Sequence, residues 1–362
     1  MKKLLILGVN GFIGHHLSEA VLRDTDWHVY GMDLESDRVA QLLAHPRFHY
    51  FEGDITINRE WVEYHIRKCD VLLPLVAIAT PATYISDPLR VFELDFEANL
   101  PLIRQCVKYK KRVVFPSTSE IYGMCPDREF HPYDSHLVLG PIPKSRWIYS
   151  CSKQLLDRVI WAYGEQGLDF TLFRPFNWIG PGLDRMLAAK EGSSRVLTQF
   201  LGNIVRGENI QLVDGGAQRR CFTYISDGID ALMRIIANQD GVADGKIFNI
   251  GSPENDLSVR ELAEKLIAIA ATYPEVAERV RQAKLIEVSA GDFYGSGYQD
   301  MVKRKPSIVT TSRDLGWQPR IATDEMLSRT VGYYVREFLS RERSVYDHHL
   351  RQAASASPTS AR

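Results

Sequence analysis

With 362 residues, 45% of them hydrophobic and 25% charged, the chain is long enough for one large α/β unit or for two domains. The formal net charge is only −1, and no apolar run approaches about 18 residues, so the composition argues against nucleic-acid and membrane partners. It excludes neither an enzyme nor a binding module. The five cysteines show neither paired nor metal-ligand spacing, which is typical of a reduced, cytoplasmic protein with no metal site.

Short apolar runs alternate with amphipathic stretches through the first half of the chain. Strands are predicted at 3–8, 28–33, 48–54, 70–77, 112–117 and 169–177, and helices at 14–23, 36–45 and 95–109. Alternation of this kind indicates βαβ units. We therefore expect an α/β fold with a Rossmann-type, doubly wound parallel sheet.

The texture of the sequence changes after residue 177, where glycine, proline and arginine become more frequent. We expect a nucleotide-binding domain over 1–177, to which part of 223–250 returns, and a smaller α/β substrate-binding domain mainly over 178–345. A helix is predicted at 258–273, because Ser258 precedes Glu261 by the spacing of a capping box. The small, polar tail at 350–362 is expected to be disordered.

Three glycines, Gly8, Gly11 and Gly14, follow the first predicted strand and open the first predicted helix, with Phe12 and Ile13 between the last two. Small residues are needed there because the pyrophosphate of a dinucleotide approaches the backbone N–H groups at the helix N-terminus. A glycine triplet alone also fits a tight strand–helix turn. Here the strand, the helix and a following acidic residue all stand where the dinucleotide fingerprint requires them.

The acidic residue is Asp33, at the end of the second predicted strand. Its carboxylate suits a ribose 2′-hydroxyl and would repel a 2′-phosphate, so NAD is predicted rather than NADP. Asp54 and Ile55, which close the third strand, are predicted to border the adenine. The glycine spacing, G-x-x-G-x-x-G, resembles that of the extended short-chain dehydrogenases/reductases.

Tyr149 and Lys153 stand four residues apart in "YSCSK", which places them on one face of a helix. A tyrosine with an ordinary pKa of about 10 is a poor base at neutral pH, but a lysine ammonium and an oxidised nicotinamide beside it would lower that pKa. Y-x-x-x-K also occurs by chance on surface helices. After a nucleotide-binding half and the hydroxyl of Thr118 at a strand tip, it predicts proton removal from a sugar hydroxyl, with hydride passing to NAD.

The strand tip Thr118-Ser119-Glu120 discriminates among nucleotide-sugar enzymes. Epimerases of this branch carry no carboxylate there, and dehydratases carry T-D-E, in which the aspartate serves as proton donor. This chain keeps the glutamate and has serine in place of the aspartate. The T-S-E form resembles that of the UDP-glucuronic acid decarboxylases.

This resemblance extends to about residue 340 through stretches such as "PLRVFELDFEANL" and "GYQDMVKRKPSI", and it is close to the decarboxylase half of a bifunctional polymyxin-resistance enzyme. The formyltransferase half of that enzyme is not expected here. The resemblance implies NAD-dependent oxidation of the 4-hydroxyl of UDP-glucuronate, then decarboxylation to a UDP-4-keto-pentose, with some UDP-xylose left open as a second product. It also implies a homodimer, because family members pair through a helix bundle.

Residue roles follow from the same resemblance. Glu120 is implied as proton acceptor and Arg304 as proton donor, directly or through a water, with Thr118, Ser119, Tyr149 and Lys153 completing the catalytic set. The implied substrate-binding residues are Ala79, Tyr84, Arg146, Asn177, Arg195, Gln211, Arg220 and Tyr298. Gln211 stands where a family member has lysine. Arg219 suits a phosphate contact and a solvated salt bridge equally well.

The chemistry can also be argued from the reaction itself. Oxidising the 4-hydroxyl of a glucuronate places a ketone β to the carboxylate, and such an acid loses carbon dioxide because the electrons flow into the carbonyl. Hydrogen bonds from Thr118, Tyr149 and Ser119 would stabilise the resulting oxyanion.

Of three alternative functions, one stays open and two are disfavoured. A UDP-xylose synthase shares these motifs and differs only in reducing the ketone before release. A plant-type UDP-apiose/xylose synthase is disfavoured, because it has cysteines at the positions of Ala79 and Ser119. A catalytically silent NAD-binding regulator belongs to another class, and the intact Thr118, Tyr149 and Lys153 argue against it.

Overall fold

The computed structural model describes residues 1–186, 195–295 and 297–355, with side chains up to residue 344. A seven-stranded sheet forms its centre, built from β1 (Lys3–Leu7), β2 (His28–Asp33), β3 (Phe48–Glu52), β4 (Val71–Pro74), β5 (Arg112–Pro116), β6 (Phe170–Pro175) and β11 (Lys246–Ile250). The strand order is β11-β6-β5-β4-β1-β2-β3, and every pair is parallel. The predicted doubly wound α/β fold is therefore confirmed.

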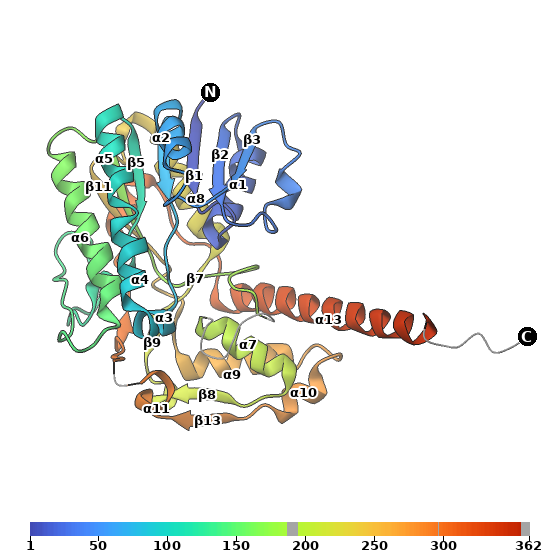
Figure 1. Cartoon of the computed structure of the whole chain (residues 1–362). Helices are drawn as coiled ribbons and strands as arrows, with labels where there is room; N and C mark the ends of the chain where they lie inside the picture. Colours follow the sequence, from blue (N-terminus) through green and yellow to red (C-terminus); the bar gives the residue numbers. More distant parts are fainter. Residues whose placement is uncertain (187–194, 296, 356–362) are drawn as a thin grey trace, which may run out of the picture.

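Helices cover both faces of this sheet (Figure 1). One face carries α1 (Phe12–Asp24) and α8 (Ile225–Ala237), and the other carries α2 (Arg59–Lys68), α5 (Leu100–Tyr109) and α6 (Trp147–Gly164). Strand side chains alternate between the two cores, so that Leu4 and Ile6 pack on the first set and Leu5 and Leu7 on the second. Burial on both faces explains why these strands are continuous apolar runs.

A smaller lobe lies below the carboxyl ends of the strands in the view of Figure 1. Its elements are α7 (Val196–Arg206), β8 (Ile210–Val213), α9 (Val259–Ala270), α10 (Ala277–Gln282), β13 (Leu285–Val288), α11 (Ala290–Tyr294) and the long α13 (Thr323–Ser355). Strands β8 and β13 pair in parallel. Ser258 and Glu261 form the predicted capping box at the start of α9.

The described chain also contains short elements between these helices and strands. They are α3 (Pro81–Ser86), α4 (Pro88–Phe92), the π-helix η2 (Glu93–Glu97), the 3-10 helix η3 (Ser119–Tyr122), β7 (Trp178–Ile179), β9 (Arg219–Cys221), β10 (Thr223–Tyr224), β12 (Asp256–Ser258), β14 (Lys303–Arg304) and α12 (Val309–Leu315), with 3-10 turns η1 (Ala40–Leu42), η4 (Asp214–Gly216) and η5 (Gln239–Gly241). Strand β9 pairs with β12 on one side and with β14 on the other, so it ties three distant segments together.

Two predicted segments differ from the structure. The helix predicted at 36–45 is only the short turn η1, in which the N–H groups of Leu42 and Leu43 donate to the carbonyls three residues back. The side-chain oxygen of Asn10 accepts the backbone N–H groups of Arg38 and Val39 before this turn. Residues 350–355 continue α13 rather than belonging to the disordered tail expected over 350–362. The rest of that tail lies outside the described residues.

Candidate active site

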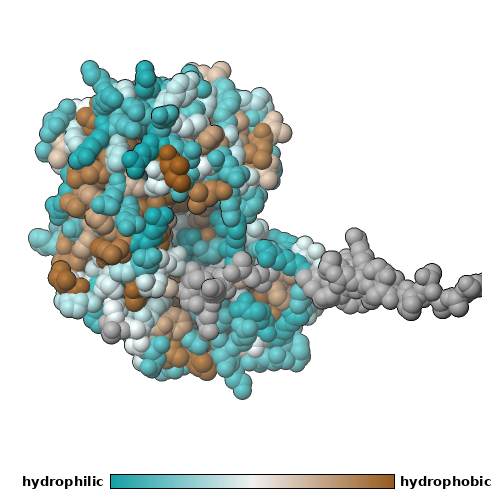
Figure 2. Space-filling model, viewed as in Figure 1, coloured by the Kyte–Doolittle hydropathy of each residue, from teal (hydrophilic) through white to brown (hydrophobic). Residues whose placement is uncertain are grey.

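A cavity of about 850 Å³ opens where the carboxyl ends of β1, β4, β5 and β6 face the smaller lobe. In the space-filling view the surface is hollowed between the upper and lower parts of the molecule (Figure 2). This position, next to the point where the strand order reverses between β1 and β4, is where doubly wound sheets bind their ligands. The cavity is within the size range of small-molecule sites.

The glycine loop after β1 forms one wall of this cavity. Gly8 has a φ of +87°, and a Cβ on Gly14 would lie 2.5 Å from the carbonyl oxygen of Gly8. Larger residues would therefore break the tight turn that brings backbone N–H groups and the start of α1 to the cavity. Phe12 and Ile13 line the same wall. The loop has the shape that a dinucleotide pyrophosphate requires.

Asp33 lies behind this loop, at the end of β2. Its carboxylate accepts the backbone N–H groups of Asn10 and Leu34, each at 2.8 Å. Burial raises the pKa of Asp33, and these two hydrogen bonds oppose that rise. Asp33, Asp54 and Ile55 are not among the residues that line the cavity, and they lie at the neighbouring ends of β2 and β3.

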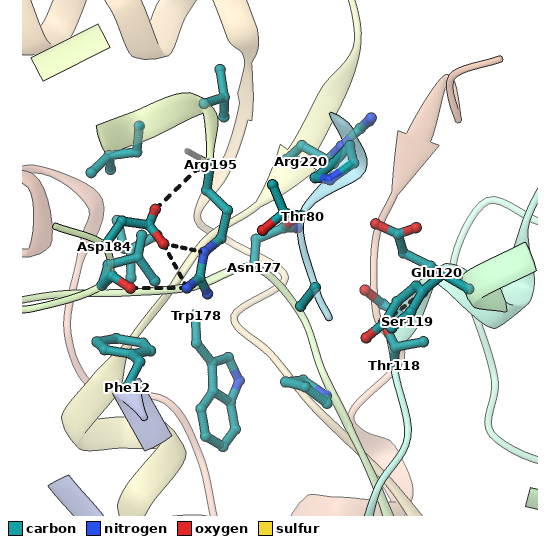
Figure 3. Close-up of a pocket in the computed structure, with 18 of the residues that line it drawn as sticks. Phe12, Thr80, Thr118, Ser119, Glu120, Asn177, Trp178, Asp184, Arg195 and Arg220 are labelled. Atoms are coloured by element: carbon teal, nitrogen blue, oxygen red, sulfur yellow. Dashed lines mark hydrogen bonds and ion pairs between the residues drawn. The ribbon is translucent and has the colours of Figure 1, made fainter. Parts of the chain in front are cut away.

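The strand tip after β5 is shaped by its own residues. Thr118 caps η3, because its hydroxyl oxygen accepts the backbone N–H of Glu120 at 3.2 Å. Gly123 ends the turn with a φ of +57°, and a Cβ there would lie 2.0 Å from the carbonyl oxygen of Val138. Thr118, Ser119 and Glu120 thus enter the cavity from one rigid turn (Figure 3).

Tyr149 of α6 faces Thr118 across the cavity and hydrogen-bonds to it. The ring of Tyr84 stacks on that of Tyr149 with 4.7 Å between their centroids. Lys153, one turn along α6, forms a buried ion pair with Asp95 at 3.4 Å. The pKa of Tyr149 is raised here, first by burial and then by the negative charges of Asp95 and Glu120. The lowering expected when an oxidised nicotinamide lies beside Tyr149 and Lys153 stays a prediction.

Glu120 belongs to a largely buried group of five charged side chains. Its two carboxylate oxygens contact Arg146 at 2.9 Å and Arg304 at 3.2 Å. Burial would raise the pKa of Glu120, but Arg146 and Arg304 outweigh it, so that pKa lies below its ordinary value. Beside them, Arg220 pairs with Asp300 at 2.6 Å. Glu120 is therefore an ionised carboxylate held between two cations.

The same group has an excess of one positive charge, since three arginines face two carboxylates. Nε and Nη1 of Arg146 and Nε of Arg304 are buried without a hydrogen-bond partner in the described part of the chain. Burial, followed by the nearby Arg220 and Arg146, lowers the pKa of Arg304, although Glu120 acts in the opposite direction. An anion placed here would meet unsatisfied guanidinium donors.

The remaining predicted substrate residues fall into two groups. Ala79, Asn177, Gln211 and Tyr298 line the cavity, and the Tyr298 ring lies 5.6 Å from the guanidinium carbon of Arg146. Arg195 also lines it, but its guanidinium is held by Asp184 at 2.8 Å (Figure 3).

Arg219 lies outside the cavity lining. It pairs with Asp256 at 3.1 Å and with Glu261 at 3.2 Å. Of the two roles that suit Arg219, the structure therefore shows the salt bridge.

Sequence reasoning missed several side chains at this site. Asn10 fixes the loop after β2, Asp95 pairs with Lys153, and Asp300 pairs with Arg220. Asp95 and Asp300 both belong to stretches that carried the family resemblance, so a search for acidic partners of the candidate cations could have found them.

Two other findings bear on the site. Within the described ranges, no group of three or more histidine, cysteine, aspartate or glutamate side chains is arranged to hold a metal ion. Among the helices that the structure describes, none combines the length and the apolar character needed to cross a membrane.

Comparison with known proteins gave three informative matches. Residues 4–251 match the profile of a family described as NAD dependent epimerase/dehydratase. The PbgP3 protein of Burkholderia pseudomallei has a crystal structure that is 62% identical, with a TM-score of 0.85 over 92% of this chain and 96% of that one. UDP-glucuronic acid 4-epimerase from Bacillus cereus, in complex with UDP-glucuronic acid and NAD, is 21% identical, with a TM-score of 0.73 over 92% of this chain and 99% of that one, and shows the shared fold alone.

Proposed function

Because this chain belongs to the NAD dependent epimerase/dehydratase family, we propose that it is an NAD-dependent UDP-glucuronate decarboxylase, an oxidoreductase and lyase. In this proposal it oxidises the 4-hydroxyl of UDP-glucuronate and releases the carboxyl group as carbon dioxide, which leaves a UDP-4-keto-pentose. The family membership confirms NAD as the cofactor. The glycine loop fits its pyrophosphate, and the bound nicotinamide would accept the hydride from carbon 4.

The observation that carries the proposal is the buried group around Glu120. A neutral hexose needs no cation at its carbon 5 substituent, whereas a uronic acid brings a carboxylate. The excess positive charge and the unpaired donors of Arg146 and Arg304 suit one additional carboxylate at this place.

In the proposed reaction, the residues of the site would have separate roles. With oxidised nicotinamide bound beside it, Tyr149 would act as the phenolate and accept the proton of the 4-hydroxyl, while Thr118 orients that hydroxyl. Glu120 would place a negative charge beside the substrate carboxylate, which favours loss of carbon dioxide. Thr118, Tyr149 and Ser119 would donate to the enolate oxygen, and Arg304 would supply the proton to carbon 5, directly or through a water.

The uridine diphosphate would occupy the part of the cavity in the smaller lobe. Arg220, Gln211 and Asn177 line it there, and the side chain of Arg220 is held in place by Asp300. A guanidinium fixed in this way suits a diphosphate oxygen.

A cytoplasmic homodimer completes the proposal. On α6, Leu155 is 48% exposed and lies one turn from the exposed Cys151, and Leu89 on the adjoining α4 is 71% exposed. Apolar side chains also gather on the left of the molecule in Figure 2, where Figure 1 places α4 and α6. Leu155→Glu is expected to convert a dimer into monomers in sedimentation, and a wild-type monomer would contradict this part of the proposal.

A time course by NMR, with UDP-glucuronate and NAD, tests the activity. A hydrated UDP-4-keto-pentose that appears together with NADH and carbon dioxide supports the proposal, and Tyr149→Phe is the inactive control. UDP-xylose without net NADH would instead identify a xylose synthase. A 4-epimer that keeps its carboxylate, or no reaction at all, would exclude decarboxylation and leave an epimerase or a silent NAD-binding regulator.

A further inference from the structure

A second buried charge pair lies behind the candidate base, apart from the group around Glu120. Oδ1 of Asp95, in η2, lies 3.4 Å from Nζ of Lys153, and the two side chains are 0% and 1% exposed. The other oxygen of Asp95 accepts the backbone N–H of Ile78 at 3.0 Å. Burial raises the pKa of Asp95, while Lys153 and this N–H oppose that rise. The two contacts favour the charged form of the carboxylate, but burial outweighs them, and the pKa of Asp95 stays above its ordinary value.

The element that carries Asp95 is itself unusual. Residues Glu93–Glu97 form a π-helix between α4 and α5, and π-helical turns often occur at functional sites. Asp95 is the buried residue of this turn.

Several charged or titratable groups face Tyr149 from the surrounding elements. They are Asp95 from η2, Glu120 from η3, Arg304 from β14, Tyr84 from α3 and Lys153 from α6 itself. After burial, Asp95 is the strongest influence that raises the pKa of Tyr149, ahead of Glu120. The hydrogen bond to Thr118 and the charge of Arg304 act in the opposite direction.

We propose that Asp95 is a positioning residue that takes up the charge of Lys153 and so withholds that charge from Tyr149. An isolated ammonium one helical turn away would favour the phenolate, and a buried carboxylate on that ammonium cancels much of the effect. The hydroxyl of Tyr149 therefore keeps its proton in the cofactor-free protein. Lys153, held at 3.4 Å and without a hydrogen-bonding partner among the described residues, keeps its N–H donors for a ligand.

This inference relies on the proposed function only in taking Tyr149 as the base. The variant Asp95→Asn keeps the shape of the side chain and an oxygen for Ile78, but removes the charge. In the cofactor-free protein, the titration of Tyr149 is read from tyrosinate absorbance as the difference between each protein and its Tyr149→Phe counterpart. We expect Asp95→Asn to move this titration to lower pH by about one unit or more.

A second measurement uses the active enzyme. The rise of kcat/KM with pH is expected to move to lower pH by a similar amount in Asp95→Asn. A merely structural role would lower activity at every pH without this shift. Asp227→Asn is the matched control, because Asp227 is a buried carboxylate that accepts two backbone N–H groups and does not line the cavity.

If Asp95→Asn does not fold because it leaves Lys153 unpaired, the substitution is made together with Lys153→Met and compared with Lys153→Met alone. Lys153→Met alone leaves the charge of Asp95 uncompensated and should titrate Tyr149 at higher pH than the wild type, whereas the double variant removes the pair as a neutral whole and should titrate Tyr149 as the wild type does. Coinciding titrations of the wild type and Asp95→Asn, or of Lys153→Met and the double variant, would overturn the inference. Because the titration uses no substrate, this result is distinct from a failure of the decarboxylase proposal.

Discussion

Arg304 and Arg146 hold opposite oxygens of Glu120, at 3.2 Å and 2.9 Å, so the carboxylate lies between two guanidinium groups within the protein. Both arginines keep buried donors that no described residue satisfies. In the proposed reaction, Glu120 holds these cations in place and also opposes the charge of a substrate carboxylate beside them.

Replacing Glu120 separates these two effects. Glu120→Gln keeps the size of the side chain but leaves the cations with one fewer negative charge. We expect tighter binding of UDP-glucuronate, seen as a lower KM, and a fall in kcat of about 100-fold or more in a coupled NADH and carbon dioxide assay. Glu129→Gln, an exposed carboxylate paired with Lys305, is the control. Normal turnover in Glu120→Gln would rule out the proposed role.

Arg220 and its neighbour Arg219 form a natural pair of variants. Arg220 is buried, lines the cavity and is held by Asp300, whereas Arg219 pairs with Asp256 and Glu261 outside it. Arg220→Gln is expected to weaken the binding of UDP by about tenfold or more, measured by calorimetry, because a charge-assisted contact is lost. Arg219→Gln should bind UDP as the wild type does. Equal losses in the two variants would place the diphosphate elsewhere.

Cofactor selectivity should depend on Asp33. Asp33→Gly removes the carboxylate behind the glycine loop, while Arg38 remains in the cavity lining. We expect weaker binding of NAD and measurable binding of NADP, since the 2′-phosphate no longer meets a negative charge. Fluorescence titration with both cofactors measures this, with Asp54→Asn as a comparison. Unchanged preference for NAD would show that other groups set it.

The pair of Asp184 and Arg195 should make stability depend on pH. Burial would raise the pKa of Asp184, but Arg195 and Thr198 lower it below its ordinary value. Stability from this pair is therefore complete above the unfolded pKa of about 4 and is lost as the pH falls through the lower folded value.

Arg195→Gln is expected to cost about 1–2 kcal/mol in urea unfolding at pH 7, because Arg195 is partly exposed, and less at pH 3. Arg23→Gln, which breaks an exposed pair with Asp24, should change little at either pH. A loss that is independent of pH would contradict the assignment.

Local sequence patterns predicted the elements whose bounds depend on residues close together in the chain. β2 has the predicted bounds, 28–33, and the capping box of α9 is present. The helix predicted at 36–45 was wrong, because its N–H groups donate three residues back as in a 3-10 turn, and the start of the segment is held by Asn10, which is distant in sequence. A periodic pattern carries no information about such a partner.

At the candidate site, too, the sequence predicted some features and missed others. Motifs identified Glu120, Tyr149 and Lys153 as candidates, and the structure brings them to one cavity. Their charge states could not be inferred from spacing, because burial is the first cause that raises the pKa of Tyr149, and the negative charge of Asp95 adds to it. The catalytic roles of these residues stay predictions for the experiments above.

The pairing of β9 with β14 has a geometric consequence. Arg220 and Arg304 are register partners in this pair, so a cation proposed for the diphosphate and a cation proposed for the sugar carboxylate are joined by one strand ladder. The backbone pairing therefore fixes the distance between the Cα atoms of the two arginines that would bind the two anions of a ligand. The site would therefore select nucleotide sugars whose acid group lies at one particular distance from the phosphates.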